Sequence, residues 1–89
     1  MMDALAFPDM EHRFGAFADV GPDAEIAQYF ATEEEATAAA REIWAGLTAE
    51  ERRGTDVYAG RINLAKVEGR LVWDTVAVFY DAKAEEARA

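Results

Sequence analysis

Carboxylates are the most abundant side chains capable of chemistry in this sequence, and they are concentrated near its start. The first 35 residues hold nine acids and one base, whereas the rest of the chain holds nine acids and eight bases. The early acids are Asp3, Asp9, Glu11, Asp19, Asp23, Glu25, Glu33, Glu34 and Glu35. Such a field repels nucleic acid and anionic membranes, and it attracts basic protein surfaces. We therefore expect a protein partner, without direct binding to nucleic acid or to a membrane.

The residue types needed for most covalent catalysis are missing. The chain has no cysteine and no serine, so the two commonest side-chain nucleophiles are absent. Its single histidine, His12, lies in a polar stretch near the N-terminus. One histidine supports neither a histidine acid–base pair nor a multi-histidine metal site. Carboxylate catalysis remains open, but no acid pair stands out by its spacing. The sequence therefore predicts a protein that is not an enzyme and has no catalytic residue, metal site or cofactor.

The length and composition predict one small domain over residues 1–89, with mobile tails at 1–11 and 82–89. A domain of this size buries only about 60–65% of its unfolded surface, so a homodimer interface is a reasonable source of extra stability. No apolar run approaches the roughly 20 residues of a membrane span, and the first residues lack the basic start of a signal peptide. With no cysteine, the chain is expected in the reducing cytoplasm.

Two alternating segments in the first third predict a β-hairpin. Residues 13–20 alternate in polarity, and so do residues 24–30. The sequence Gly21-Pro22-Asp23 between them is a strong turn signal. Asp19, Asp23 and Glu25 could instead hold a hard cation, but their spacing does not match an EF-hand loop and turn chemistry explains them.

Two capping boxes predict two consecutive helices. Thr32 with Glu35 begins the first helix, and Gly46 marks its end. The inward face consists of Ala36, Ala40, Ile43 and, just after Gly46, Leu47. Thr48 with Glu51 begins a short second helix that stops at Gly54. Arg52 and Arg53 could bind a phosphate, although cations at a helix C-terminus need no such role. Trp44 and Trp73 could be binding anchors, but both are expected to pack inward.

The last third predicts a second hairpin, of residues 56–67 and 70–81 around Glu68-Gly69. With a two-residue loop, the numbers of paired residues add up to 137. One face then pairs Tyr58 with Phe79, Gly60 with Ala77, Ile62 with Thr75 and Leu64 with Trp73. The opposite face is half apolar and is expected to be covered partly by another chain. The predicted dimer interface on it consists of Val72, Val76, Val78 and Tyr80.

These elements together predict the α+β fold class. The expected order is β-β-α-(short α)-β-β, with an antiparallel sheet and the main helix packed on one face.

A resemblance covers residues 26–53. An aromatic strand end, Tyr29-Phe30, runs into Thr32-Glu33-Glu34-Glu35-Ala36, and Ala40, Trp44, Leu47, Thr48 and Glu51 come after it in a fixed spacing. This pattern resembles small uncharacterised proteins of bacteria and mobile elements. In size and acidity the chain is similar to phage anti-defence proteins, including anti-CRISPR inhibitors. The resemblance brings no catalytic residue with it.

Two hypotheses of function result. The first is a non-enzymatic inhibitor that uses an acidic surface to occupy the basic site of a nucleic-acid-binding protein, in its most specific form a CRISPR effector. Its partner-binding residues are expected to be Asp19, Asp23, Glu25, Glu33, Glu34 and Glu35. The alternative is a small homodimeric structural or regulatory protein without nucleic-acid mimicry.

Overall fold

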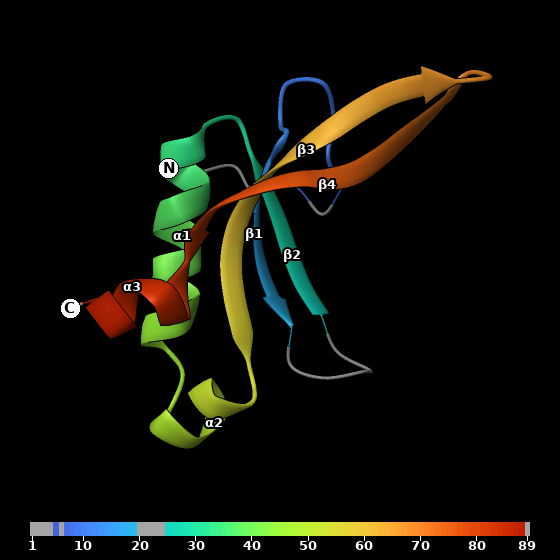
Figure 1. Ribbon diagram of the computed structural model, residues 1–89. Coiled ribbons are helices and arrows are strands. Elements are labelled where there is room, and N and C mark those ends of the chain that lie inside the picture. The colour runs from blue at the N-terminus through green and yellow to red at the C-terminus, as the bar shows by residue number, and fades with distance from the viewer. Residues whose placement is uncertain (1–4, 6, 20–24, 89) are drawn as a thin grey trace.

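The structure is a computed structural model, and it describes residues 5, 7–19 and 25–88. Its elements, in chain order, are β1 (Phe14–Asp19), β2 (Glu25–Phe30), α1 (Glu33–Ala45), α2 (Ala49–Arg53), β3 (Asp56–Val67), β4 (Arg70–Asp81) and α3 (Ala82–Arg88). The four strands form one antiparallel sheet in the order β2-β1-β3-β4, and α1 lies across one face of it (Figure 1). The predicted α+β class, element order and helix position are confirmed.

The first hairpin has the predicted strands. Phe14 pairs with Phe30 and Asp19 pairs with Glu25, and β1 also pairs with β3 on its other side. The expected turn at Gly21-Pro22-Asp23 lies outside the described residues. Leu5, from the expected N-terminal tail, exchanges two backbone hydrogen bonds of 3.0 Å with Tyr29 on the outer side of β2.

The second hairpin has the predicted two-residue turn. Glu68 and Gly69 both have positive φ, of 53° and 78°, as a type I′ turn requires. The predicted register is confirmed from Val67 opposite Arg70 to Ile62 opposite Thr75.

Farther from the turn the register departs from the prediction. Arg61 pairs with Ala77, and Ala59 pairs with Tyr80, so β4 has one extra residue at Val76 and another at Phe79. These irregularities have the effect of β-bulges, which insert a residue and change the side that the later residues face. The predicted pairing of Tyr58 with Phe79 is therefore wrong, because Tyr58 pairs with Asp81. Phe79 instead packs edge-to-face on Phe14, with the ring centroids 6.3 Å apart.

Helix α1 packs on the sheet through its predicted inward face. Ala36 and Ala40 are fully buried, Ala39 joins them, and Ile43 and Leu47 pack at the border of the same cluster. Seven of that cluster's nine buried residues are alanines, so the helix can approach the strands closely although each contact buries little area. The Thr32 hydroxyl accepts from the Glu35 amide at 3.1 Å, which caps the helix as predicted. The Glu35 carboxylate accepts from the Thr32 hydroxyl at 3.0 Å and not from the Thr32 amide, so the predicted capping box is only half formed.

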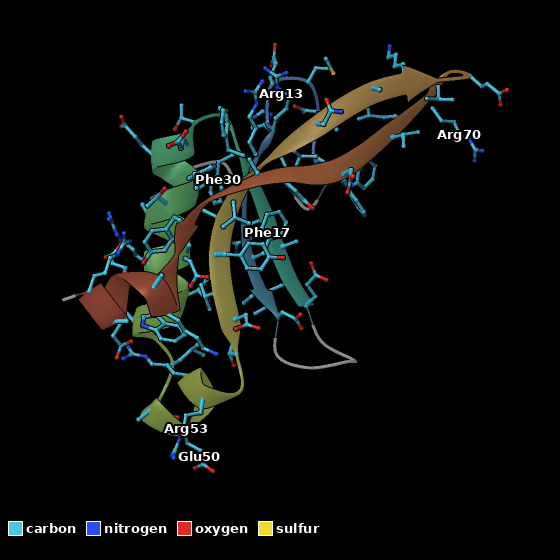
Figure 2. All side chains as sticks on the ribbon, viewed as in Figure 1. Arg13, Phe17, Phe30, Glu50, Arg53 and Arg70 are labelled. Carbon is cyan, nitrogen blue, oxygen red and sulfur yellow. The ribbon has the colours of Figure 1, made fainter. Side chains whose placement is uncertain are left out.

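The sheet has apolar clusters on both faces. Val57 and Ala59 lie under α1 with Phe30, whereas Phe17, Tyr29 and Ile62 form a second cluster on the opposite face (Figure 2 labels Phe17 and Phe30). The sequence predicts a core on the face of Tyr58 and Ile62, and it leaves the face of Val57 and Ala59 for another chain. The prediction that another chain covers the face of Val57 and Ala59 is wrong, because α1 covers it.

The far halves of β3 and β4 extend past the other strands. β1 pairs with β3 only from Asp56 to Arg61, and Ile62 is still buried in the second cluster, so residues 63–74 continue as a two-stranded arm (Figure 1). Trp73 lies on this arm and is 42% exposed, so its predicted inward packing is wrong. The arm lies beyond the reach of α1, which explains why the apolar alternation there does not lead to burial.

The two shorter helices lie at the end of the molecule opposite the arm (Figure 1). α2 begins with the predicted capping box of Thr48 and Glu51 and ends before Gly54. α3 forms where the sequence predicts a fraying helix or tail. The Asp81 carboxylate accepts from the Lys83 and Ala84 amides, and Ala82 is buried in the α1 cluster.

Candidate functional site

The predicted acidic residues fall into two separate groups. Asp19 and Glu25 pair at the ends of β1 and β2, and Asp56 of β3 pairs with Asp19 on its other side. We call Glu25, Asp19 and Asp56 the acidic row. Asp23 lies outside the described residues. The row crosses three neighbouring strands, which brings like charges to adjacent positions, an arrangement that disfavours folding unless other interactions offset it.

Glu33, Glu34 and Glu35 form the other group, in the first turn of α1. α1 begins shortly after Phe30, at the end of β2 opposite Glu25, so the length of β2 separates the two groups. The five of the six predicted residues that the structure describes therefore do not form one contiguous edge. In the first turn, the three carboxylates favour the positive end of the helix dipole, which accounts for them without a partner.

The acidic row lies beside two tyrosines of the second cluster, on the sheet face opposite α1. Tyr58 lies on the same side of β3 as Asp56, and its ring stacks on Phe17 with 5.1 Å between ring centroids. Burial raises the pKa of the Tyr58 hydroxyl, and the negative charges of Glu25, Asp19 and Asp56 raise it further. Burial and Glu25 likewise raise the pKa of Tyr29. This end of the sheet therefore combines negative charge with neutral aromatic hydroxyls.

The predicted dimer residues do not share one face. Val72 pairs with Ala65 and Tyr80 pairs with Ala59, so both lie on the α1 side of the sheet. Val78 pairs with Gly60, on the opposite side. The side chain of Val76 lies outside the described part of the chain. The predicted common face is wrong because the extra residue at Val76 turns Val78 to the opposite side, and the extra residue at Phe79 returns Tyr80 to the α1 side. Tyr80 is packed there against the α1 cluster.

β4 nevertheless offers a surface suited to pairing. It is the last strand in the sheet order, and it is 12 residues long. Val72 is 50% exposed and Val78 54% exposed, and Val67 at the arm's tip is similarly open. Charged Arg70 and Asp74 stand at the next same-side positions on either side of Val72. An edge strand of this length with exposed apolar side chains can add a strand from another chain.

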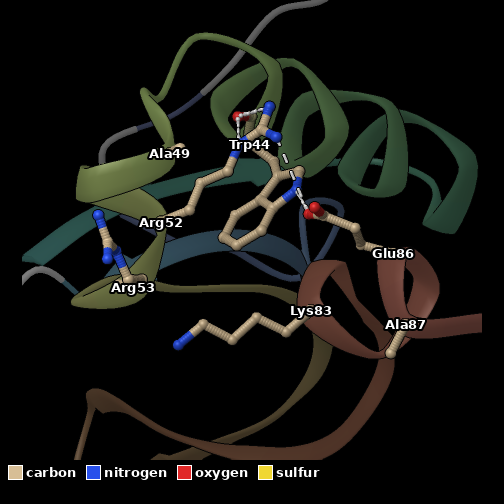
Figure 3. A pocket seen from close by; sticks show the side chains of 7 residues that line it. All are labelled: Trp44, Ala49, Arg52, Arg53, Lys83, Glu86 and Ala87. Atoms are coloured by element: carbon tan, nitrogen blue, oxygen red, sulfur yellow. Dashed lines mark hydrogen bonds and ion pairs between the residues drawn. The ribbon is translucent and has the colours of Figure 1, made fainter.

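A pocket of about 670 Å³ lies between α1, α2 and α3 (Figure 3). Arg52 donates to the Trp44 carbonyl from Nε at 3.1 Å and from Nη2 at 2.9 Å, and its guanidinium lies 5.0 Å from the centroid of the Trp44 ring. The indole Nε1 of Trp44 donates to Glu86 at 2.8 Å. Two further cations, Arg53 and Lys83, line the same pocket.

The sequence alone does not predict this pocket. It indicates Arg52 and Arg53 as helix C-terminal cations and Trp44 as a core residue. Lys83 and Glu86 come from the expected tail, roughly 40 residues after Trp44, so no local spacing links them to it. The mixture of alanines and charged residues after Asp81 is the one available signal, because it permits a capped helix.

In the ranges 7–19 and 25–88, together with Leu5, no cluster of three or more acids, histidines or cysteines is arranged to hold a metal ion. His12 is partly buried, and its Nδ1 lies 2.8 Å from the Asp9 carboxylate, which lowers the pKa of Asp9. No helix in the described parts of the chain is both long and apolar enough to cross a membrane.

Comparison with known proteins gives no relative. No family model, curated protein or solved structure matches the chain.

Proposed function

We propose that the chain is a non-enzymatic cytoplasmic binding protein, and that β4 binds a second copy of the chain as its partner. The observation that carries the proposal is the free edge of β4, where a half-exposed valine stands between an arginine and an aspartate. A long exposed edge strand normally carries some feature that blocks pairing, such as a proline or a charge pointing inward. Residues 70–75 of β4 contain no proline and precede both extra residues of the strand, so this part of the edge remains suited to another strand.

The sequence of the arm is complementary to itself in the antiparallel direction. If two β4 strands pair about a two-fold axis at Val72, then Val72 faces its own copy. Arg70 of each copy then faces Asp74 of the other, which gives two ion pairs around one apolar contact. Leu71 of each copy faces Trp73 of the other on the opposite side of the ribbon. A C2 interface requires this kind of self-complementarity.

The backbone has the right phase for this pairing. In a type I′ hairpin the flanking residues Val67 and Arg70 exchange hydrogen bonds, and the bonding alternates from there. The N–H and C=O groups of Leu71 and Trp73 therefore point to the free edge. There the backbone of Leu71 in one copy can hydrogen-bond to the backbone of Trp73 in the other. Val72 and the Arg70–Asp74 pairs then occupy non-hydrogen-bonded positions, in which opposing side chains are closest.

A charge-swap series tests the dimer. Arg70→Asp places aspartate against Asp74 of the other copy, and Asp74→Arg places two arginines together, so each single variant should weaken the dimer. The double variant Arg70→Asp/Asp74→Arg restores opposite charges and should restore it. Within the chain Arg70 pairs with Val67, and Asp74 pairs with Asn63, so neither swap creates a like-charge pair inside one copy.

Sedimentation equilibrium over a wide concentration range measures the association. Lys66→Asp is the matched control, because Lys66 lies on the same arm but on β3, away from the free edge. It should leave the dissociation constant within about twofold of the wild type. A wild-type chain that stays monomeric, or a double variant no better than the single ones, would refute the pairing.

A second function is favoured by the acidic row. Glu25, Asp19 and Asp56 lie together beside Tyr58, and this arrangement brings like charges to neighbouring strands without improving the core. We propose that the row docks on a basic surface of a nucleic-acid-binding protein, for which a CRISPR effector is the most specific candidate. Electrostatic steering would then increase the association rate and make binding sensitive to salt.

The two acidic groups can be tested separately. In pull-downs from nuclease-treated host lysate, Asp19→Lys/Glu25→Lys should abolish recovery of a basic partner, whereas Glu33→Lys/Glu34→Lys/Glu35→Lys should retain most of it. Added duplex DNA should compete if the partner's nucleic-acid site is occupied. Equal loss in both variants would indicate general charge attraction, and undiminished recovery in the first would exclude the row.

A further inference from the structure

The pocket between α1, α2 and α3 is a basic and aromatic recess in this acidic chain. Arg52, Arg53 and Lys83 line it with a single acid, Glu86, although the whole chain carries a net charge of −9. Its volume of about 670 Å³ is within the range of small-molecule sites. The recess lies at the end of the molecule opposite the β4 arm, so it is independent of the proposed dimer (Figure 1).

The polar groups deep in the pocket are already satisfied by each other. Glu86 accepts from the Trp44 indole at 2.8 Å and lies 3.9 Å from the Arg52 guanidinium. Arg52 in turn donates twice to the Trp44 carbonyl. These contacts lock the indole in one orientation. They also neutralise Arg52, so its charge does not by itself recruit an anion.

The mouth of the pocket is different, because its cations are available. Arg53 forms no hydrogen bond or ion pair with the described part of the chain, and its side chain is exposed. Lys83 has one partner, the Asp56 carboxylate at 3.1 Å, in an ion pair with both side chains exposed. Exposed pairs of this kind contribute little and exchange readily. Figure 3 shows the Arg53 and Lys83 side chains on the same side of the pocket, with the Trp44 ring between them and Glu86.

We propose that this pocket binds a small aromatic phosphate. The dianionic phosphate would lie between Arg53 and Lys83, which come from two different helices and supply two separate positive groups. The aromatic body would lie against Trp44, whose orientation Glu86 and Arg52 hold, with the methyl groups of Ala49 and Ala87 completing the apolar wall. A carboxylate supplies only one negative charge for the two cations. A free phosphate supplies two charges but leaves the indole of Trp44 without a ring to pack on. The proposed ligand therefore combines an aromatic ring with a dianion.

The test uses the indole N–H of Trp44 as the reporter. The Trp73→Phe variant has Trp44 as its only tryptophan, so its single indole resonance in a proton–nitrogen correlation spectrum reports on the pocket. Phenyl phosphate should shift this resonance saturably. Inorganic phosphate and phenol, which each supply one half of the ligand, should bind about tenfold more weakly or worse. Benzyl phosphate should behave like phenyl phosphate if recognition is of the class.

The matched variants remove equal charge at two places. Arg53→Gln/Lys83→Gln should raise the dissociation constant for phenyl phosphate about tenfold or more. Arg61→Gln/Lys66→Gln removes two charges from β3 and should change the dissociation constant less than about twofold. All four side chains are exposed, so both variants are expected to fold, and circular dichroism checks this. Absence of a saturable shift, equal affinity for inorganic phosphate, or equal loss in both variants would each overturn the proposal.

Discussion

Replacing Gly15 by alanine should destabilise the fold, because the ring of Phe17 occupies the space that a side chain would need. A Cβ placed on Gly15 would lie 2.3 Å from Cζ and 2.6 Å from Cε2 of that ring. A flexible exposed ring could move aside at little cost. Phe17, however, is only 3% exposed and is held between Tyr58, stacked at 5.1 Å, and Tyr29, edge-on at 5.8 Å.

The magnitude results from two opposing terms. Overpacking of a filled core costs about 1–3 kcal/mol. Removing a glycine from a strand returns about 0.5–1 kcal/mol through the lower entropy of the unfolded chain. The net loss should be about 1 kcal/mol, within an outer range of about 0–2.5 kcal/mol, and a loss of about 1 kcal/mol lowers Tm by roughly 4–8 °C in a domain of this size. Urea unfolding followed by circular dichroism measures the free energy, and thermal unfolding measures Tm.

Gly54 provides the matched control. No atom lies within 4 Å of a Cβ built there, and its φ of −105° suits any residue. Gly54→Ala should therefore leave stability unchanged or raise it by up to about 1 kcal/mol. In a Phe17→Leu background the cost of Gly15→Ala should disappear, which gives a coupling free energy of about 1 kcal/mol. Equal effects of the two glycine substitutions, or no coupling to position 17, would refute the steric reasoning.

Three further predictions concern caps and titrating groups. Thr48→Ala should cost about 1 kcal/mol, because the hydroxyl accepts from the Glu51 amide at 3.1 Å. The same capping box holds the pKa of Glu51 below its ordinary value. The stabilising effect of the Glu51 carboxylate is therefore present at neutral pH and lost as pH falls through that lowered pKa. Carboxyl NMR should show the pKa of Glu51 return toward its ordinary value in Thr48→Ala. Asp81→Ala should destabilise α3 by about 1 kcal/mol, measured as faster amide exchange in residues 83–88, since its carboxylate accepts from two amides of the first turn. The raised pKa of Tyr58 should fall in Glu25→Gln in an ultraviolet absorbance titration; because that pKa is raised in the folded chain, its contribution is present at neutral pH and lost as pH rises through it.

Local signals in the sequence are enough to predict most of the elements. Thr32 and Thr48 with their glutamates mark both helix starts, and Glu68-Gly69 marks a turn whose register holds for the six nearest pairs. These features depend on residues only a few positions apart, so propensity and capping chemistry determine them.

The wrong predictions concern effects that involve distant residues. The composition of β4 does not predict the extra residues at Val76 and Phe79. They lie where β4 passes from the arm into the sheet under α1, so they depend on contacts with distant residues. Since the register moves there, the predicted faces of Ala77 and Val78 are wrong, and the second extra residue returns Tyr80 to its predicted face. The pocket is not predicted for the same reason, because its hydrogen bond between Trp44 and Glu86 joins residues that are distant in the sequence. Glu86 belongs to a segment whose composition is typical of a tail, although Ala82 at its start is buried in the α1 cluster.

The alanine-rich core bears on why association is expected. Among the described residues, the large hydrophobic side chains that are at most 3% exposed are Phe17, Phe30, Val57 and Ile62, while most of the α1 interface consists of alanines. Alanine lets the helix approach closely but removes little apolar area from water, and buried area sets the hydrophobic stabilisation. The chain meanwhile exposes Val67, Val72 and Trp73 on an arm that contributes nothing to the α1 cluster. A domain with limited internal burial that projects apolar side chains along a free edge gains stability when that edge is covered, which is the physical reason for the proposed pairing of β4.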